Sequence, residues 1–123
     1  MDWTMIILEL ALIPGIMLYF GRSFMMKTPK KNSGIAFRTE LALKNDDTWV
    51  FANTYLGRLW FKMGSVLAVL TIVVMGMSLS ASNAVIGITA GIMMLVHLIP
   101  LIASLVMTQM ALKKNFDSFG NRK

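Results

Sequence analysis

Residues 32–58 read NSGIAFRTELALKNDDTWVFANTYLGR and form the only long polar segment of the chain. The sequence on both sides is apolar enough to lie in a bilayer. The segment combines a turn signal at Gly34, the pair Arg38 and Thr39, a helix start and the tryptophan Trp49. A connection that only joined two membrane spans would not need this combination. We therefore predict that the segment carries specificity and that the flanking spans anchor it.

The composition indicates a single membrane domain. Of the 123 residues, 56% are hydrophobic, and the mean hydropathy is +0.66, which is high for a soluble domain. The chain has no cysteine, which excludes disulfides, thiolate metal sites and thiol nucleophiles. It also lacks the motifs of P-loop enzymes, zinc hydrolases and serine hydrolases. We therefore predict a protein that is not an enzyme and needs no cofactor or metal.

The apolar runs predict an all-α integral membrane protein with three transmembrane helices, at about 3–20, 63–79 and 84–112. A motif loop, 22–62, joins the first two spans, and a basic tail, 113–123, follows the third and is expected to fray. The first apolar run has neither a basic region before it nor a small-residue cleavage site after it, so it does not resemble a cleavable signal peptide.

Two local features of the helices can be predicted from residue type. Pro14 and Gly15 should kink or loosen the first span, because proline removes a backbone donor and crowds the preceding turn. Asn45 or Asp46 suits the N-cap of a helix that starts in the loop and continues without a break into the second span. The first part of this helix should be amphipathic, with Trp60 near the membrane interface.

The distribution of positive charge predicts the topology. Eight lysines and arginines lie between residues 22 and 62, four lie in the tail, and the hairpin at 80–83 has none. The net charge of +6 is therefore better explained by orientation in a membrane than by a nucleic-acid partner. By the positive-inside rule, the motif loop and the C-terminus are cytoplasmic, and the N-terminus and the hairpin are outside.

The loop holds a group of candidate binding residues, Arg38, Thr39, Trp49 and Asn53. An arginine offers a planar fork of donors to a carboxylate or phosphate, and Asn53 lies one helical turn from Trp49, so the two can share a face. The group is interpreted either as a recognition surface or as a structural lock, in which Arg38 pairs with the acidic residues at the helix start.

The same segment resembles the SdpI family of bacterial membrane proteins. The residues that carry the resemblance are Asn32, Gly34, Ile35, Phe37, Arg38, Thr39, Asn45, Asp46, Asp47, Thr48, Trp49, Ala52, Asn53, Gly57 and Arg58. The resemblance covers roughly residues 1–110 and departs from the family pattern at Glu40, where a basic or neutral residue is expected. Longer members also have additional spans before the motif.

The resemblance implies a multi-pass protein of the bacterial plasma membrane that confers immunity to a secreted peptide toxin. Some members of the family hold a small regulatory protein, a repressor, at the membrane, so the resemblance also allows for a signalling role. The implied partners are the lipid bilayer, a peptide toxin and that regulatory protein. The implied binding residues are Asn32, Gly34, Arg38, Thr39, Trp49 and Asn53.

Two polar residues and one glycine motif lie inside the predicted spans. An acid within a span is costly and marks a functional hypothesis, so Glu9 is a candidate, as is His97 near the middle of the third span. They suggest an alternative function as a small transporter or accessory subunit, although counting along the helices places them at different depths. Gly87 and Gly91 form a GxxxG motif, which is expected to serve internal packing or a homo-oligomer.

Overall fold

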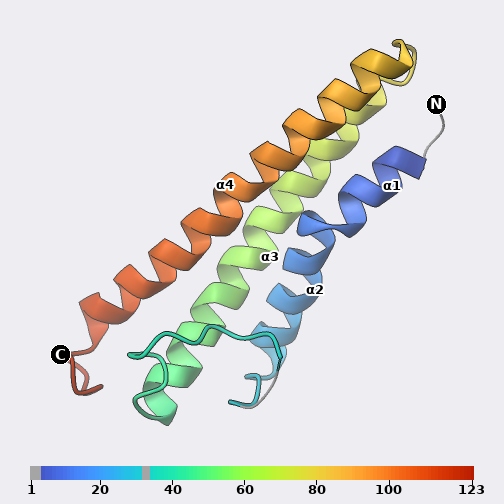
Figure 1. Cartoon of the computed structure of the whole chain (residues 1–123). Helices are drawn as coiled ribbons and strands as arrows, with labels where there is room; N and C mark the ends of the chain where they lie inside the picture. Colours follow the sequence, from blue (N-terminus) through green and yellow to red (C-terminus); the bar gives the residue numbers. More distant parts are fainter. Residues whose placement is uncertain (1–3, 32–33) are drawn as a thin grey trace.

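The computed structural model describes residues 4–31 and 34–123. Four helices account for most of these residues: α1 (Thr4–Ala11), α2 (Ile13–Met26), α3 (Asp46–Met77) and α4 (Asn83–Asn115). Figure 1 shows that α1 and α2 run one after the other beside a long antiparallel hairpin made of α3 and α4. The all-α fold class is therefore confirmed.

In the described part of the chain, three helical stretches are long and apolar enough to cross a membrane, namely Ile6–Met26, Asp46–Met77 and Asn83–Asn115. Among the described residues, the prediction of three helices able to cross a membrane is confirmed. The first extends to Met26, beyond the predicted end of its span at residue 20, and the second starts at Asp46 in the loop and continues without a break, as predicted. At about 1.5 Å per residue, α3 and α4 are each roughly 50 Å long. They therefore extend beyond a hydrocarbon core of about 30 Å.

The first span is broken where the sequence predicts it. α1 ends at Ala11 and α2 begins at Ile13, with Pro14 in its first turn. Leu12, between them, has a ψ of −115°, outside helical geometry. Proline fits the first turn of a helix because its missing N–H would have no partner there. The amide of Leu12 still donates to Leu8 at 3.2 Å, so the chain bends without exposing many backbone groups.

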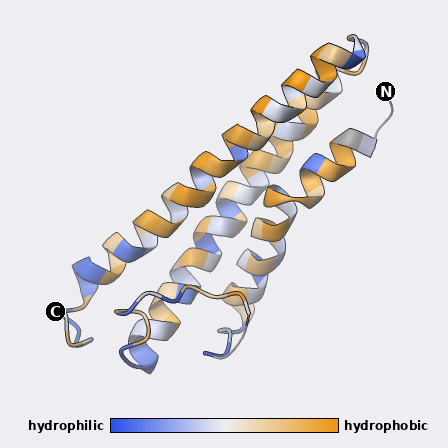
Figure 2. Ribbon diagram, viewed as in Figure 1, coloured by the Kyte–Doolittle hydropathy of each residue, from blue (hydrophilic) through white to orange (hydrophobic). Residues whose placement is uncertain are grey.

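The outward faces of the helices are apolar over most of their length (Figure 2). Many large hydrophobic side chains are exposed along α3 and α4, among them Val66, Val69, Ile88, Leu95 and Ile99. An apolar exterior of this extent is unfavourable in water and favourable in lipid. The polar residues gather at one end of the bundle, where the loop between α2 and α3 lies near the C-terminus (Figure 1).

Close packing between α2 and α3 depends on glycines that the sequence did not single out for this role. A Cβ on Gly57 would lie 2.9 Å from the backbone oxygen of Gly21, and a Cβ on Gly21 would lie 2.6 Å from the backbone nitrogen of Phe61. Both glycines therefore let the two backbones approach, as small residues do in membrane bundles. Trp60, next to this contact, is buried against Phe24 with ring centroids 6.0 Å apart.

One expectation about the spans is wrong and another stays a prediction. That Trp60 lies near the membrane interface stays a prediction; its side chain points into the bundle, where Nε1 donates to Ser104 Oγ at 2.9 Å. Gly87 and Gly91 do not serve internal packing, since a Cβ at either position would meet no atom within 4 Å. Both lie on an exposed face of α4. Of the two roles expected for the GxxxG motif, only a homo-oligomer contact remains as a proposal.

Candidate functional site

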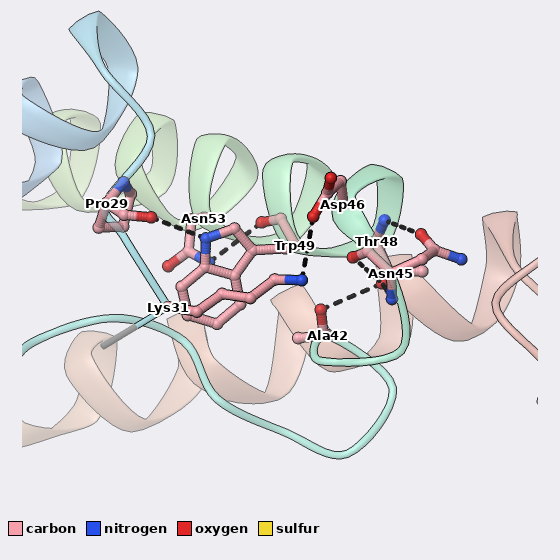
Figure 3. Close-up of polar contacts among 8 residues, drawn as sticks. All are labelled: Pro29, Lys31, Ala42, Asn45, Asp46, Thr48, Trp49 and Asn53. Carbon is pink, nitrogen blue, oxygen red and sulfur yellow. Dashed lines mark hydrogen bonds and ion pairs between the residues drawn. The ribbon is translucent and has the colours of Figure 1, made fainter. Parts of the chain in front are cut away.

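The polar end of the bundle is built on the first turn of α3. Asn45 is the N-cap: its side chain accepts from the amide of Thr48 at 2.9 Å, and Thr48 Oγ1 accepts from the amide of Asn45 at 3.1 Å. This reciprocal pair is a capping box, which satisfies backbone donors that the helix leaves free. The hydroxyl of Thr48 is also 3.0 Å from the carbonyl of Ala42 (Figure 3). The predicted helix start is confirmed, and the capping box also anchors the preceding turn.

Trp49 and Asn53 hold the loop against α3 from the inside. Trp49 is 4% exposed, and its Nε1 donates to the carbonyl of Pro29 at 2.7 Å (Figure 3). Asn53 is fully buried, and its Oδ1 accepts from the amide of Phe37 at 2.7 Å. The Nδ2 of Asn53 donates to the carbonyl of Trp49 at 3.1 Å. The two side chains share a face, as the spacing predicts, but that face is turned toward the loop backbone and not toward solvent.

This arrangement directs Arg38 outward. The chain is without regular structure at residues 37–39, and Phe37 is buried with its amide bound to Asn53. The next residue, Arg38, is exposed. It lines an open groove of about 450 Å³ whose other wall includes Leu105, Val106 and Gln109 of α4. The groove therefore joins a cationic side chain to an apolar helix face.

The predicted pairing of Arg38 with the acidic helix start is wrong. Asp46 forms an ion pair with Lys31 at 3.0 Å (Figure 3). Asp47 accepts two hydrogen bonds from Arg122, at 2.8 and 2.9 Å. Both acids are therefore occupied by cations from other segments, and Arg38 is turned toward α4 by the buried position of its neighbour. Thr39, the neighbouring candidate, has a local role: its Oγ1 accepts from the amide of Ala42 at 3.3 Å.

The predicted site residues Gly34 and Asn32 have no described contact at the site. Gly34 is exposed, and a Cβ there would meet no atom within 4 Å. A methyl group at this position would therefore meet open space. Asn32 lies outside the described residues.

The C-terminal tail folds back onto the start of α3, contrary to the expectation that it would fray. Arg122 donates two hydrogen bonds to the carboxylate of Asp47. Its guanidinium carbon also lies 4.8 Å from the ring centroid of Phe116. The hydrogen bond to Asp47 raises the pKa of Arg122, so the guanidinium stays charged. Asn45 Nδ2 donates to the carbonyl of Gly120 at 2.8 Å. The two hydrogen-bonded contacts, Arg122 with Asp47 and Gly120 with Asn45, each join residues 75 positions apart, so the local sequence gave no signal for them.

The tail also completes a second groove. An open space of about 650 Å³ lies between the loop, the end of α4 and the tail, and its charged lining residues include Glu40, Lys44, Lys113 and Lys123. Gln109 lines both this groove and the one beside Arg38. Its side-chain oxygen is buried and has no hydrogen-bond partner. A buried acceptor without a donor is costly, and Gln109 is the residue that the two grooves share.

Glu9 and His97 are brought together inside the membrane bundle. Their nearest atoms, Glu9 Oε2 and His97 Nδ1, are 3.9 Å apart, and both residues are buried, at 4% and 0% exposed. The prediction that they lie at different depths is therefore wrong. It assumed that α1 starts level with the α3–α4 hairpin turn, whereas the hairpin extends well beyond the start of α1 (Figure 1).

The fold and the site together define a class: a helical membrane protein with three spans and a structured polar cap at one end. A sequence model of the SdpI/YfhL protein family matches residues 28–108, about two thirds of the chain. The chain therefore belongs to the SdpI/YfhL family, as its resemblance indicated. The match contains the loop, α3 and most of α4. Searches of curated proteins and of solved structures found no match.

Proposed function

We propose that this protein confers immunity to a membrane-active peptide toxin from the cytoplasmic side of the bacterial plasma membrane. Membership of the SdpI/YfhL family supports a membrane protein of this type. The observation that carries the proposal is the groove that joins exposed Arg38 to the apolar residues Leu105 and Val106 of α4. A toxin that partitions into the membrane has both apolar and polar surface, and this groove offers a contact for each.

The orientation rests on charge. The loop and the tail lie at the same end of the bundle (Figure 1). All 12 lysines and arginines of the chain lie either in residues 22–62 or in the tail, residues 113–123. By the positive-inside rule this end faces the cytoplasm. The proposed binding groove would then lie at the cytoplasmic boundary of the bilayer, where anionic groups of a lipid or peptide are accessible to an arginine.

The proposal is tested by protection of a susceptible bacterium. Cells that express the protein are exposed to the secreted hydrophobic peptide encoded beside its gene, or to a panel of purified membrane-active peptides where no such gene is present. Arg38→Ala should weaken binding by about tenfold or more, because a hydrogen bond to a charged group contributes about 1.5–3 kcal/mol. Arg38→Lys should restore little, since a point charge does not reproduce the fork of the guanidinium.

Lys44→Ala is the matched control. It removes the same charge from the same loop, and Lys44 makes only a loose contact of 3.9 Å with Glu40 on the surface. If Arg38→Lys and Lys44→Ala both protect cells as well as the original sequence, Arg38 contributes only to topology and the proposed recognition role is wrong. If no peptide in the panel is opposed by the unaltered protein, the immunity function itself is wrong.

A second candidate function, transport across the membrane, is favoured by the meeting of Glu9 and His97 in the bundle. Ionisable groups that pair inside membrane proteins often lie on ion or proton pathways. Uptake or efflux of protons by vesicles that contain the purified protein, monitored with a pH-sensitive dye, tests this candidate. Vesicles whose proton leak equals that of protein-free vesicles would exclude it.

A further inference from the structure

Three helices each place one buried polar side chain at the same level of the bundle. Below the hairpin, Ile6 of α1, Met75 of α3 and Met93 of α4 belong to one apolar cluster. One turn farther from the hairpin along each helix lie Glu9, Thr71 and His97, at 4%, 0% and 0% exposed. The three polar groups therefore have apolar packing between them and the hairpin.

The hydrogen bonds of Thr71 fix which nitrogen of His97 carries the proton. Thr71 Oγ1 lies 2.7 Å from the carbonyl oxygen of Leu67, which can only accept. The single hydroxyl proton of Thr71 is therefore donated to Leu67. Thr71 Oγ1 also lies 2.8 Å from His97 Nε2. Because the hydroxyl proton is already used, His97 must donate from Nε2–H, and Nδ1 of the neutral ring is left with a lone pair.

That lone pair faces a carboxyl group. His97 Nδ1 and Glu9 Oε2 are both buried, neither has a hydrogen-bond partner, and they are 3.9 Å apart. Two acceptors facing each other would repel, whereas one proton between them makes a donor–acceptor pair after a small movement. A single proton also leaves the pair with no net charge, either as acid and imidazole or as carboxylate and imidazolium. With no proton it would carry a buried negative charge, which is expensive in a bilayer.

Among residues 4–31 and 34–123, the other ionisable groups are remote along each helix. The nearest along the sequence of their own helices are Tyr19 on α2, Lys62 on α3 and Lys113 on α4. Glu9 is the only ionisable residue of α1. Within the part of the chain that the structure describes, the charge state of the pair is therefore set by its two members.

We propose that Glu9 and His97 form a proton-binding site inside the membrane bundle, which holds one proton between Oε2 and Nδ1 and is oriented by Thr71. The ligand of the site is the proton itself. The site lies away from the polar end, so the inference does not depend on toxin immunity, and it does not require that protons cross the membrane.

The composition of the chain makes the test direct. There is one histidine, and the only glutamates are Glu9 and Glu40. Protein labelled with ¹⁵N-histidine and ¹³C-carboxyl glutamate is reconstituted in phospholipid bilayers at neutral pH. Solid-state NMR then counts the protons on the imidazole, and isotope-edited infrared spectroscopy counts them on the carboxyl. The exposed Glu40 supplies an internal signal for an ordinary ionised carboxylate.

The expected result is a proton on Nε2 and one further proton shared by the pair. The Nδ1 resonance should lie between the values of a bare and a protonated ring nitrogen. In Glu9→Leu it should move to the value of a bare nitrogen, and in Glu40→Gln it should not move. Thr71→Val should remove the preference for the proton on Nε2.

Three results would overturn the proposal, and each can be seen in the unaltered protein even if a variant fails to fold. The first is an ionised Glu9 beside a neutral imidazole, which means no shared proton. The second is a protonated Glu9 beside an imidazolium, which means two protons. The third is a neutral ring protonated on Nδ1, which reverses the tautomer. A Glu9→Leu spectrum identical to that of the unaltered protein would also refute the contact.

Discussion

The substitution Asn53→Ala tests whether a buried amide holds the specificity loop in place. In the structure, Asn53 Oδ1 accepts from the amide of Phe37 at 2.7 Å, and the side chain is fully buried. Alanine would leave that backbone N–H without a partner in a buried position. An unsatisfied buried donor costs about 1–3 kcal/mol. The local opening of the loop should therefore become about 5- to 150-fold more frequent.

Hydrogen–deuterium exchange of the protein in lipid nanodiscs measures this opening directly. The amide of Phe37 should exchange faster by that factor in Asn53→Ala, while amides in the middle of α4 should keep their rates. Asn115→Ala is the matched control: Asn115 is exposed, and its Nδ2 donates only to the carbonyl of Ala111 in its own helix. If the exchange of Phe37 is unchanged in Asn53→Ala, the loop is held by other contacts and our account of this asparagine fails.

Two further predictions concern the membrane bundle. Gly57→Ala should destabilise the protein by about 1–3 kcal/mol, because the new methyl group would lie 2.9 Å from a backbone oxygen of α2. Gly87→Ala should not destabilise the protein, because its methyl group meets open space. Equal melting temperatures of the two variants in detergent would refute the close approach at Gly57. Cysteines placed singly at Ser80 and Ser118, both exposed, should be labelled by an impermeant thiol reagent from opposite sides of the membrane. Labelling of both from one side would exclude three spans.

Much of the fold was predictable because membrane spans depend on composition, which is local. An uncharged apolar run of sufficient length must be helical, since a bilayer offers no partners for backbone groups. The break at Pro14 and the helix start at Asn45 were also predictable, since each follows from the chemistry of one or two residues. These features require no knowledge of which helix lies next to which.

The features that sequence reasoning missed all depend on contacts between distant segments. The pairing of Arg122 with Asp47 decides which cation the helix start receives, and it requires the end of α4 to return to the start of α3. The depth of Glu9 relative to His97 depends on how far the hairpin extends beyond α1. Glycine spacing was also misleading. Gly87 and Gly91 form the GxxxG motif but face open space, whereas Gly21 on α2 and Gly57 on α3 let those two helices approach closely.

The structure separates the residues of the family pattern into two groups with different consequences for function. Thr48, Trp49, Asn53 and Gly57 are buried and bind backbone or make room for a neighbouring helix. Changes at these positions should act through the shape of the loop, and they should therefore alter hydrogen exchange as well as protection. Arg38 is exposed, so its replacement should alter protection and leave exchange unchanged. Measuring both properties on the same variants distinguishes a residue that contacts a partner from one that holds the contact surface in place.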